Sequence, residues 1–100
     1  MERKIEAIAK ANGRDAVFNQ TIEECAELIV AIRHFARFGM TEKVTQLSEV
    51  WEEIADVEIM LEQLKYYLYS GKAVDDIKAQ KIERQLKRLG LTGEENGKDN

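Results

Sequence analysis

Two pairs of acidic residues constrain the fold of this chain more than any other feature. The first pair is Glu24 and Glu27, the second is Glu53 and Asp56, and each is spaced i, i+3. This spacing places both carboxylates of a pair on one face of an α-helix. The pairs are equidistant from Met40, so an antiparallel helical hairpin bent there brings Glu24 level with Asp56. Glu27 then lies level with Glu53, and each pair sits roughly 18 Å from the bend.

Four carboxylates gathered in a mostly apolar setting repel one another unless a counter-charge is present. A hard divalent cation, Mg²⁺ or alternatively Mn²⁺, is the natural partner because every ligand is an oxygen. A single pair of this kind indicates little, and four solvated acids on an outer face are the alternative. Two pairs in matching register, each embedded in apolar residues, favour a metal site.

The composition describes one small soluble domain. The chain has 100 residues, 44% of them hydrophobic and 34% charged, with a net charge of −4. So small a domain buries a limited core, and we expect self-association to bury more. The mild acidic excess argues against nucleic acid or a membrane surface as partner. No apolar run is long enough to span a membrane, and no secretory core is recognisable.

The cysteine and histidine content narrows the chemistry further. Cys25 is the single cysteine, so it cannot form an internal disulfide, which fits a reducing cytoplasm. With one cysteine and one histidine, a zinc site is not expected. There is also no Ser-His-Asp or Cys-His arrangement that would favour a covalent intermediate.

The pattern predicts an all-α fold, an antiparallel bundle of about four helices, to which the self-association expected above would add a second subunit. The chain lacks proline, and the expected helices cover residues 2–11, 15–38, 41–69 (with a possible restart at 48) and 74–89. Expected stops are Asn12-Gly13, Ser70-Gly71 and Gly90. A capping box of Thr21 with Glu24 offers a rival start for the second helix, in which Glu24 would bond its own backbone. We expect residues 1–91 to form one domain and 92–100 to be a disordered tail.

The middle helices carry wide apolar surfaces. The second is apolar around most of its circumference, which predicts burial in a core or an oligomer interface. The third carries a heptad-like seam of Val50, Ile54, Val57, Leu61, Leu64 and Leu68, typical of helix–helix packing. Trp51 is expected to pack in a core or interface rather than to shape a base pocket. His34 is expected to be a helix-end or outer-shell residue rather than a ligand.

The two acidic motifs resemble the signature of a known family. Glu23-Glu24-Cys25-Ala26-Glu27, followed by Glu53-Ile54-Ala55-Asp56, is similar to the EExxE…ExxD pattern of MazG-like all-α nucleoside triphosphate pyrophosphohydrolases. The likeness extends over roughly residues 15–90. It implies cleavage of a (d)NTP between its α- and β-phosphates, giving a nucleoside monophosphate and pyrophosphate. It also implies a homodimer or homotetramer in the cytoplasm, with a role in clearing the nucleotide pool.

The resemblance assigns roles by position. Glu24, Glu27, Glu53 and Asp56 would be Mg²⁺ ligands, and Glu23 an outer-shell group or a base that orients water. The phosphate-binding residues would be Lys78, Lys81 and Arg84 on the last helix, where the simpler interpretation is solubilising charge. Ile82 stands where the family often has an Asn, a departure that bears on how base or phosphates are held.

Two other functions compete with this one. The chain would be a non-catalytic self-association module if its carboxylate cluster is structural. A di-iron carboxylate bundle is disfavoured, because that design uses Glu-x-x-His pairs and neither motif here contains a histidine.

Overall fold

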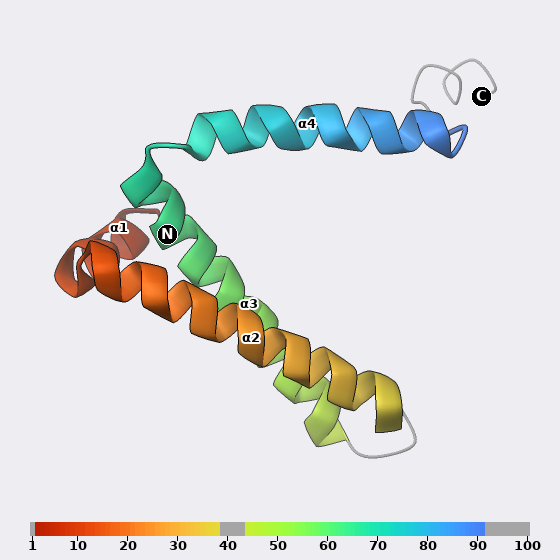
Figure 1. Ribbon diagram of the computed structural model, residues 1–100, viewed down its shortest axis with the longest axis horizontal. Helices are drawn as coiled ribbons and strands as arrows, with labels where there is room; N and C mark the ends of the chain where they lie inside the picture. The colour runs from red at the N-terminus through yellow and green to blue at the C-terminus, as the bar shows by residue number, and fades with distance from the viewer. Residues whose placement is uncertain (1, 39–43, 92–100) are drawn as a thin grey trace. The chain divides into compact units, whose positions relative to one another are not determined.

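The computed structural model describes residues 2–38 and 44–91, and every regular element among them is an α-helix. The helices are α1 (Glu2–Asn12), α2 (Arg14–Phe38), α3 (Val44–Leu68) and α4 (Gly71–Arg88) (Figure 1). The prediction of an all-α fold of about four helices is therefore confirmed for this part of the chain. The chain divides into two compact units, Met1–Tyr69 and Ser70–Asn100, so one domain over residues 1–91 stays a prediction. The predicted tail, 92–100, lies outside the described residues.

The start of α2 decides where Glu24 points. Gly13 separates α1 from α2 with a φ of 91°, a left-handed conformation that favours glycine, as the Asn12-Gly13 stop predicted. The helix then begins at Arg14 and runs through Thr21. The Thr21 hydroxyl donates to the carbonyl of Val17 at 2.7 Å, one turn back within the helix. Thr21 is therefore not a helix cap, and Glu24 is free to face another element.

The later helix ends depart from the prediction in detail. α3 begins at Val44 and passes Ser48 without a break, while the predicted start at Thr41 lies outside the described residues. It ends at Leu68 because Tyr69 adopts a left-handed φ of 52°. α4 begins at Gly71 rather than at Val74, since the Val74 N–H already donates to the Ser70 carbonyl at 2.8 Å.

The C-terminal end of α4 follows the predicted stop at Gly90. The Gly90 N–H donates to the Lys87 carbonyl at 3.1 Å, and the Leu91 N–H donates to that of Leu86 at 2.7 Å. With a φ of 71° at Gly90, this is the Schellman arrangement that terminates helices.

The unit Met1–Tyr69 is built on the antiparallel pair of α2 and α3, which lie side by side (Figure 1). α1 packs against both, and the Tyr67 hydroxyl donates to the Ala9 carbonyl at 2.6 Å. Four apolar side chains are buried among the described residues, Ala9, Val17, Val57 and Met60. Two polar residues join them in the interior, Thr21 and Gln63. This is a thin core for two 25-residue helices.

Much of the apolar surface predicted to be buried is exposed in the single chain. On α2, Ile22, Ile29 and Ile32 are 67%, 63% and 50% exposed. The seam on α3 is divided, because Val57 is buried whereas Leu61 and Leu68 are 41% and 52% exposed. Within the described ranges, no helix combines the length and apolar character needed to cross a bilayer.

Candidate metal-binding site

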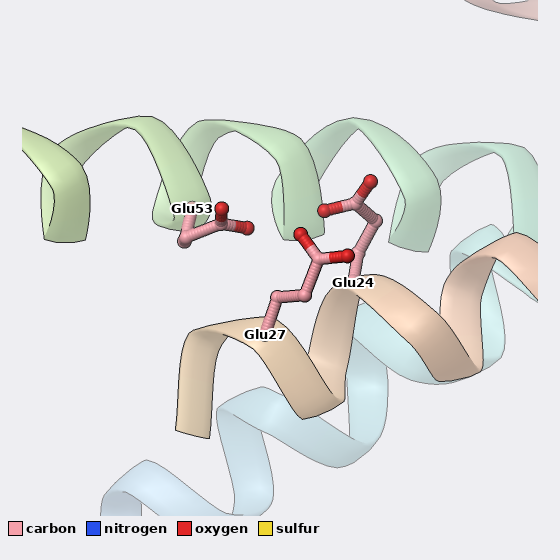
Figure 2. Close-up of side chains that lie close together, drawn as sticks. All are labelled: Glu24, Glu27 and Glu53. Carbon is pink, nitrogen blue, oxygen red and sulfur yellow. The ribbon is translucent and has the colours of Figure 1, made fainter. Parts of the chain in front are cut away.

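Three of the four predicted ligands meet between α2 and α3. Glu24 and Glu27 rise from α2 toward α3, and Glu53 extends from α3 toward them (Figure 2). One carboxylate oxygen from each residue lies within 4.8 Å of the other two. Glu24, Glu27 and Glu53 are called the acid triad below. The spacing i, i+3 thus places both α2 acids on the face that meets α3, as the sequence predicted.

Asp56, the fourth predicted ligand, lies beside the triad rather than within it. Its side chain is exposed, one turn beyond Glu53 on α3. It is close enough for its charge to help raise the pKa of Glu53. Asp56 is therefore near the triad without being part of it.

The environment of Glu53 favours its neutral form. Partial burial raises the pKa of this carboxyl above its ordinary value, and a hydrogen bond with the Glu24 side chain adds to the rise. The negative charges of Glu27, Glu24 and Asp56 raise it further. Each of these causes disfavours the ionised form of Glu53. A cation bound at the triad would stabilise the ionised form and lower this pKa.

Two oxygens of the triad have no hydrogen-bond partner although they are shielded from solvent. These are Oε1 of Glu24 and Oε1 of Glu53. The other Glu24 oxygen accepts from Gln20 Nε2 at 2.7 Å. The ion pairs of Arg14 with Asp15, Lys65 with Glu62 and Lys72 with Asp76 do not involve the triad. Shielded, unpaired carboxylate oxygens fit the donor set of a hard divalent cation.

A cavity of about 370 Å³ adjoins the triad between α2 and α3. Its lining residues are Ala26, Glu27, Val30, Ala31, His34, Glu49 and Glu53. Glu27 and Glu53 therefore belong both to the triad and to the rim of the cavity. A group bound in the cavity would lie against the carboxylates.

Two polar residues of this cavity, Glu49 and His34, were not predicted from the sequence to be ligands or catalytic residues. Glu49 lies four residues before Glu53, a spacing that places both on one face of α3, and this signal was present in the sequence. His34 was expected at a helix end or in an outer shell, and it lines the cavity seven residues after Glu27. Trp51 is 59% exposed, so within the single chain it is not a core residue.

The remaining predicted residues are not members of the triad. Glu23 is exposed on α2 and is not among the three clustered acids. Lys78, Lys81 and Arg84 are all exposed on α4, which belongs to the second unit. Their proposed contact with phosphates stays a prediction.

The raised pKa of Glu53 predicts how metal-free stability depends on pH. A carboxyl whose folded-state pKa lies above its unfolded value of 4.5 stabilises the fold fully below that value. This stabilisation is lost as pH rises through the folded-state pKa. Urea unfolding in EDTA is expected to show wild type losing stability relative to Glu53→Gln as the pH is raised above 4.5. A difference that stays constant above this pH would contradict the assignment.

Comparisons with protein-family models, with curated proteins and with solved structures give no match to this chain. The resemblance to MazG-like pyrophosphohydrolases therefore stays a prediction from the motif residues.

Proposed function

We propose that the acid triad, joined by Asp56, binds divalent cations, with Mg²⁺ as the physiological ion and Mn²⁺ as a substitute. The observation that carries the proposal is the meeting of three carboxylates from two helices, with one oxygen of each within 4.8 Å of the others. Carboxylate oxygens suit Mg²⁺ and Mn²⁺ and are poor ligands for softer metals. The unpaired oxygens of Glu24 and Glu53 are the donors that such an ion would use first.

The proposed reaction is hydrolysis of a (d)NTP to a nucleoside monophosphate and pyrophosphate. The motif resemblance suggests this reaction, and the cavity beside the triad supports it by offering space for the rest of a nucleotide. A bound cation would neutralise phosphate charge and activate water for attack. Glu24, Glu27 and Glu53 would position it from two different helices. Glu23 would orient the attacking water, and Lys78, Lys81 and Arg84 would contact the phosphates.

Cation binding can be tested without any nucleotide. Ions that bind only the folded state raise its stability, by about 2.7 kcal/mol when the free ion is at a hundred times its dissociation constant. We expect Mg²⁺ and Mn²⁺ to raise the melting temperature in a concentration-dependent way, and EDTA to reverse the rise. Glu27→Gln should remove most of this shift. An equal shift from Na⁺ at matched ionic strength would show simple screening instead.

The reaction is tested by incubating the protein with a panel of (d)NTPs and Mg²⁺ and separating the products by chromatography. We expect monophosphate and pyrophosphate in equal amounts. Orthophosphate and diphosphate would indicate attack at the γ-phosphate and would redirect the assignment. If no nucleotide is hydrolysed, the proposed enzymatic activity is contradicted.

We further propose that a second copy of the chain completes the bundle as a homodimer or within a homotetramer. The thin core and the exposed isoleucines of α2 support this, because apolar surface of this extent is normally covered. The enzyme would act on the nucleotide pool of the cytoplasm, a compartment that suits the free thiol of Cys25.

The same exposed surface favours one competing function, a helical self-association module without catalysis. In that case the acid triad would be a structural or regulatory cluster. The two functions differ in one result, since Asp56→Asn would reduce turnover in the enzyme and would have no turnover to reduce in the module.

A further inference from the structure

The cavity beside the acid triad has a small, apolar wall on α2. Ala26, Val30 and Ala31 form this wall, and Glu27 and Glu53 form the rim shared with the triad. Ala26 and Val30 are exposed, so this wall is open to solvent on one side. Its volume of about 370 Å³ lies in the lower part of the range for small-molecule sites. A flat ring can contact these methyl groups while its phosphates reach the rim.

Glu49 supplies an acidic group farther along the same cavity. It precedes Glu53 by four residues, which places it one helical turn, about 6 Å along the axis, from the triad. It lines the cavity but is not one of the three clustered acids. An ionised carboxylate offers only hydrogen-bond acceptors, so it recognises groups that carry N–H donors.

We propose that the cavity holds the base of the nucleotide and that Glu49 selects bases with an exocyclic amino group. This inference rests on the proposed function and specifies its substrate class. The amino groups of cytosine and adenine can donate to the carboxylate, as they do where proteins read base edges. Uracil and hypoxanthine carry a carbonyl oxygen at the same ring position. That oxygen cannot donate to the carboxylate, so the contact that the amino group makes with Glu49 is lost and two acceptors face each other.

The test compares nucleotides that differ at this position, CTP with UTP and ATP with ITP. Each pair exchanges an amino group for a carbonyl oxygen, together with protonation of the adjacent ring nitrogen. We expect the wild type to favour CTP and ATP in kcat/KM by at least about tenfold. Glu49→Gln should bring both ratios close to one, because an amide can turn to donate to the carbonyl.

A matched control isolates the position of the charge. Glu58 lies nine residues after Glu49, which at about 100° per residue places it on the opposite face of α3. It is exposed and does not line the cavity, so Glu58→Gln removes the same charge and should leave both ratios unchanged. The inference is overturned if wild type treats each pair equally. It is also overturned if Glu49→Gln slows all four nucleotides by the same factor, since Glu49 would then act through the cation.

Calorimetric binding of the same nucleotides in the presence of Ca²⁺ separates this inference from the proposed function. Selective binding of CTP and ATP that disappears in Glu49→Gln supports the base site even if no nucleotide is hydrolysed. Turnover without discrimination, and equal binding within each pair, would retain the enzyme and reject the base site.

Discussion

Glu53→Gln is expected to abolish nucleotide turnover while making the metal-free protein more stable. Glu53 is the sole triad member on α3, so its loss leaves the two α2 acids opposed only by Asp56, which lies outside the cluster. The amide retains the shape of the side chain and one oxygen, but it loses the charge that attracts a cation. We expect kcat/KM to fall by at least about a hundredfold, the scale at which removal of a major electrostatic group acts.

The stability gain has a separate physical cause. Glu53 is half-buried near Glu24 and Glu27, and this environment raises its pKa because it disfavours the ionised carboxylate. Gln removes the repulsion and can donate to the Glu24 carboxylate. Thermal unfolding in EDTA should therefore give a higher melting temperature for Glu53→Gln than for wild type. Addition of Mg²⁺ should reduce this difference in melting temperature, because the ion would stabilise the wild type more than the variant. Glu58→Gln, on the opposite face of α3, should change neither turnover nor the response to Mg²⁺.

A lower melting temperature in EDTA together with retained turnover would contradict both expectations. If Glu53→Gln loses turnover because the protein no longer folds, Glu27→Gln tests the role of the triad instead. The Glu27 side chain is exposed and contributes little to packing.

The sequence predicted the acid triad well because helical spacing alone decides which acids share a face. Glu24 and Glu27 needed only a continuous α2 and an antiparallel α3, and both are present. Asp56 was harder to place, because its residue position fixes its height on α3 but not the rotamer of its side chain. Glu49 had the spacing to be noticed, but its role depends on the short alanines opposite, which become neighbours only after folding.

Helix ends were less predictable than helix faces. Glycine was expected to end α3 at Gly71, yet Tyr69 takes the left-handed conformation and Gly71 begins α4. A tyrosine at positive φ gives no signal in propensity, since the surrounding chain imposes it. Burial of the apolar faces also could not be read from one chain, because the same pattern suits a core and an interface.

The second large expected effect concerns the apolar face left open by the hairpin. From the half-buried Leu28, a turn of about 100° along α2 reaches Ile29. From the buried Val57, a rotation in the same sense about the axis of α3, by roughly 40° to 60°, reaches Leu61 and Ile54. Two antiparallel helices are related by a local twofold axis perpendicular to the plane that contains them. Equal rotations in the same sense about the two helices therefore point to the same side of the pair. Ile29, Ile54 and Leu61 therefore lie on one face, which we assign to a second copy of the chain.

Leu61→Glu is expected to dissociate the oligomer, whereas Ile59→Glu should not. The two residues are 41% and 42% exposed, two positions apart on α3 and about 200° apart around it. The pair thus matches the change in charge and in exposure and differs only in the face. An uncompensated charge buried in an interface costs about 3 kcal/mol or more, over a hundredfold in the dissociation constant. Analytical ultracentrifugation measures the dissociation constant of the oligomer directly. Equal dissociation of the two variants would contradict the assignment of this face to a second copy.

If the oligomer carries part of the site, Leu61→Glu should also lower turnover, and the loss should diminish as protein concentration rises. This dependence arises because mass action restores the assembly when the interface is weakened but intact. A variant that dissociates and keeps full activity at every concentration would show that each chain holds a complete site. The acid triad would then act without the partner, and the apolar face would contribute stability alone.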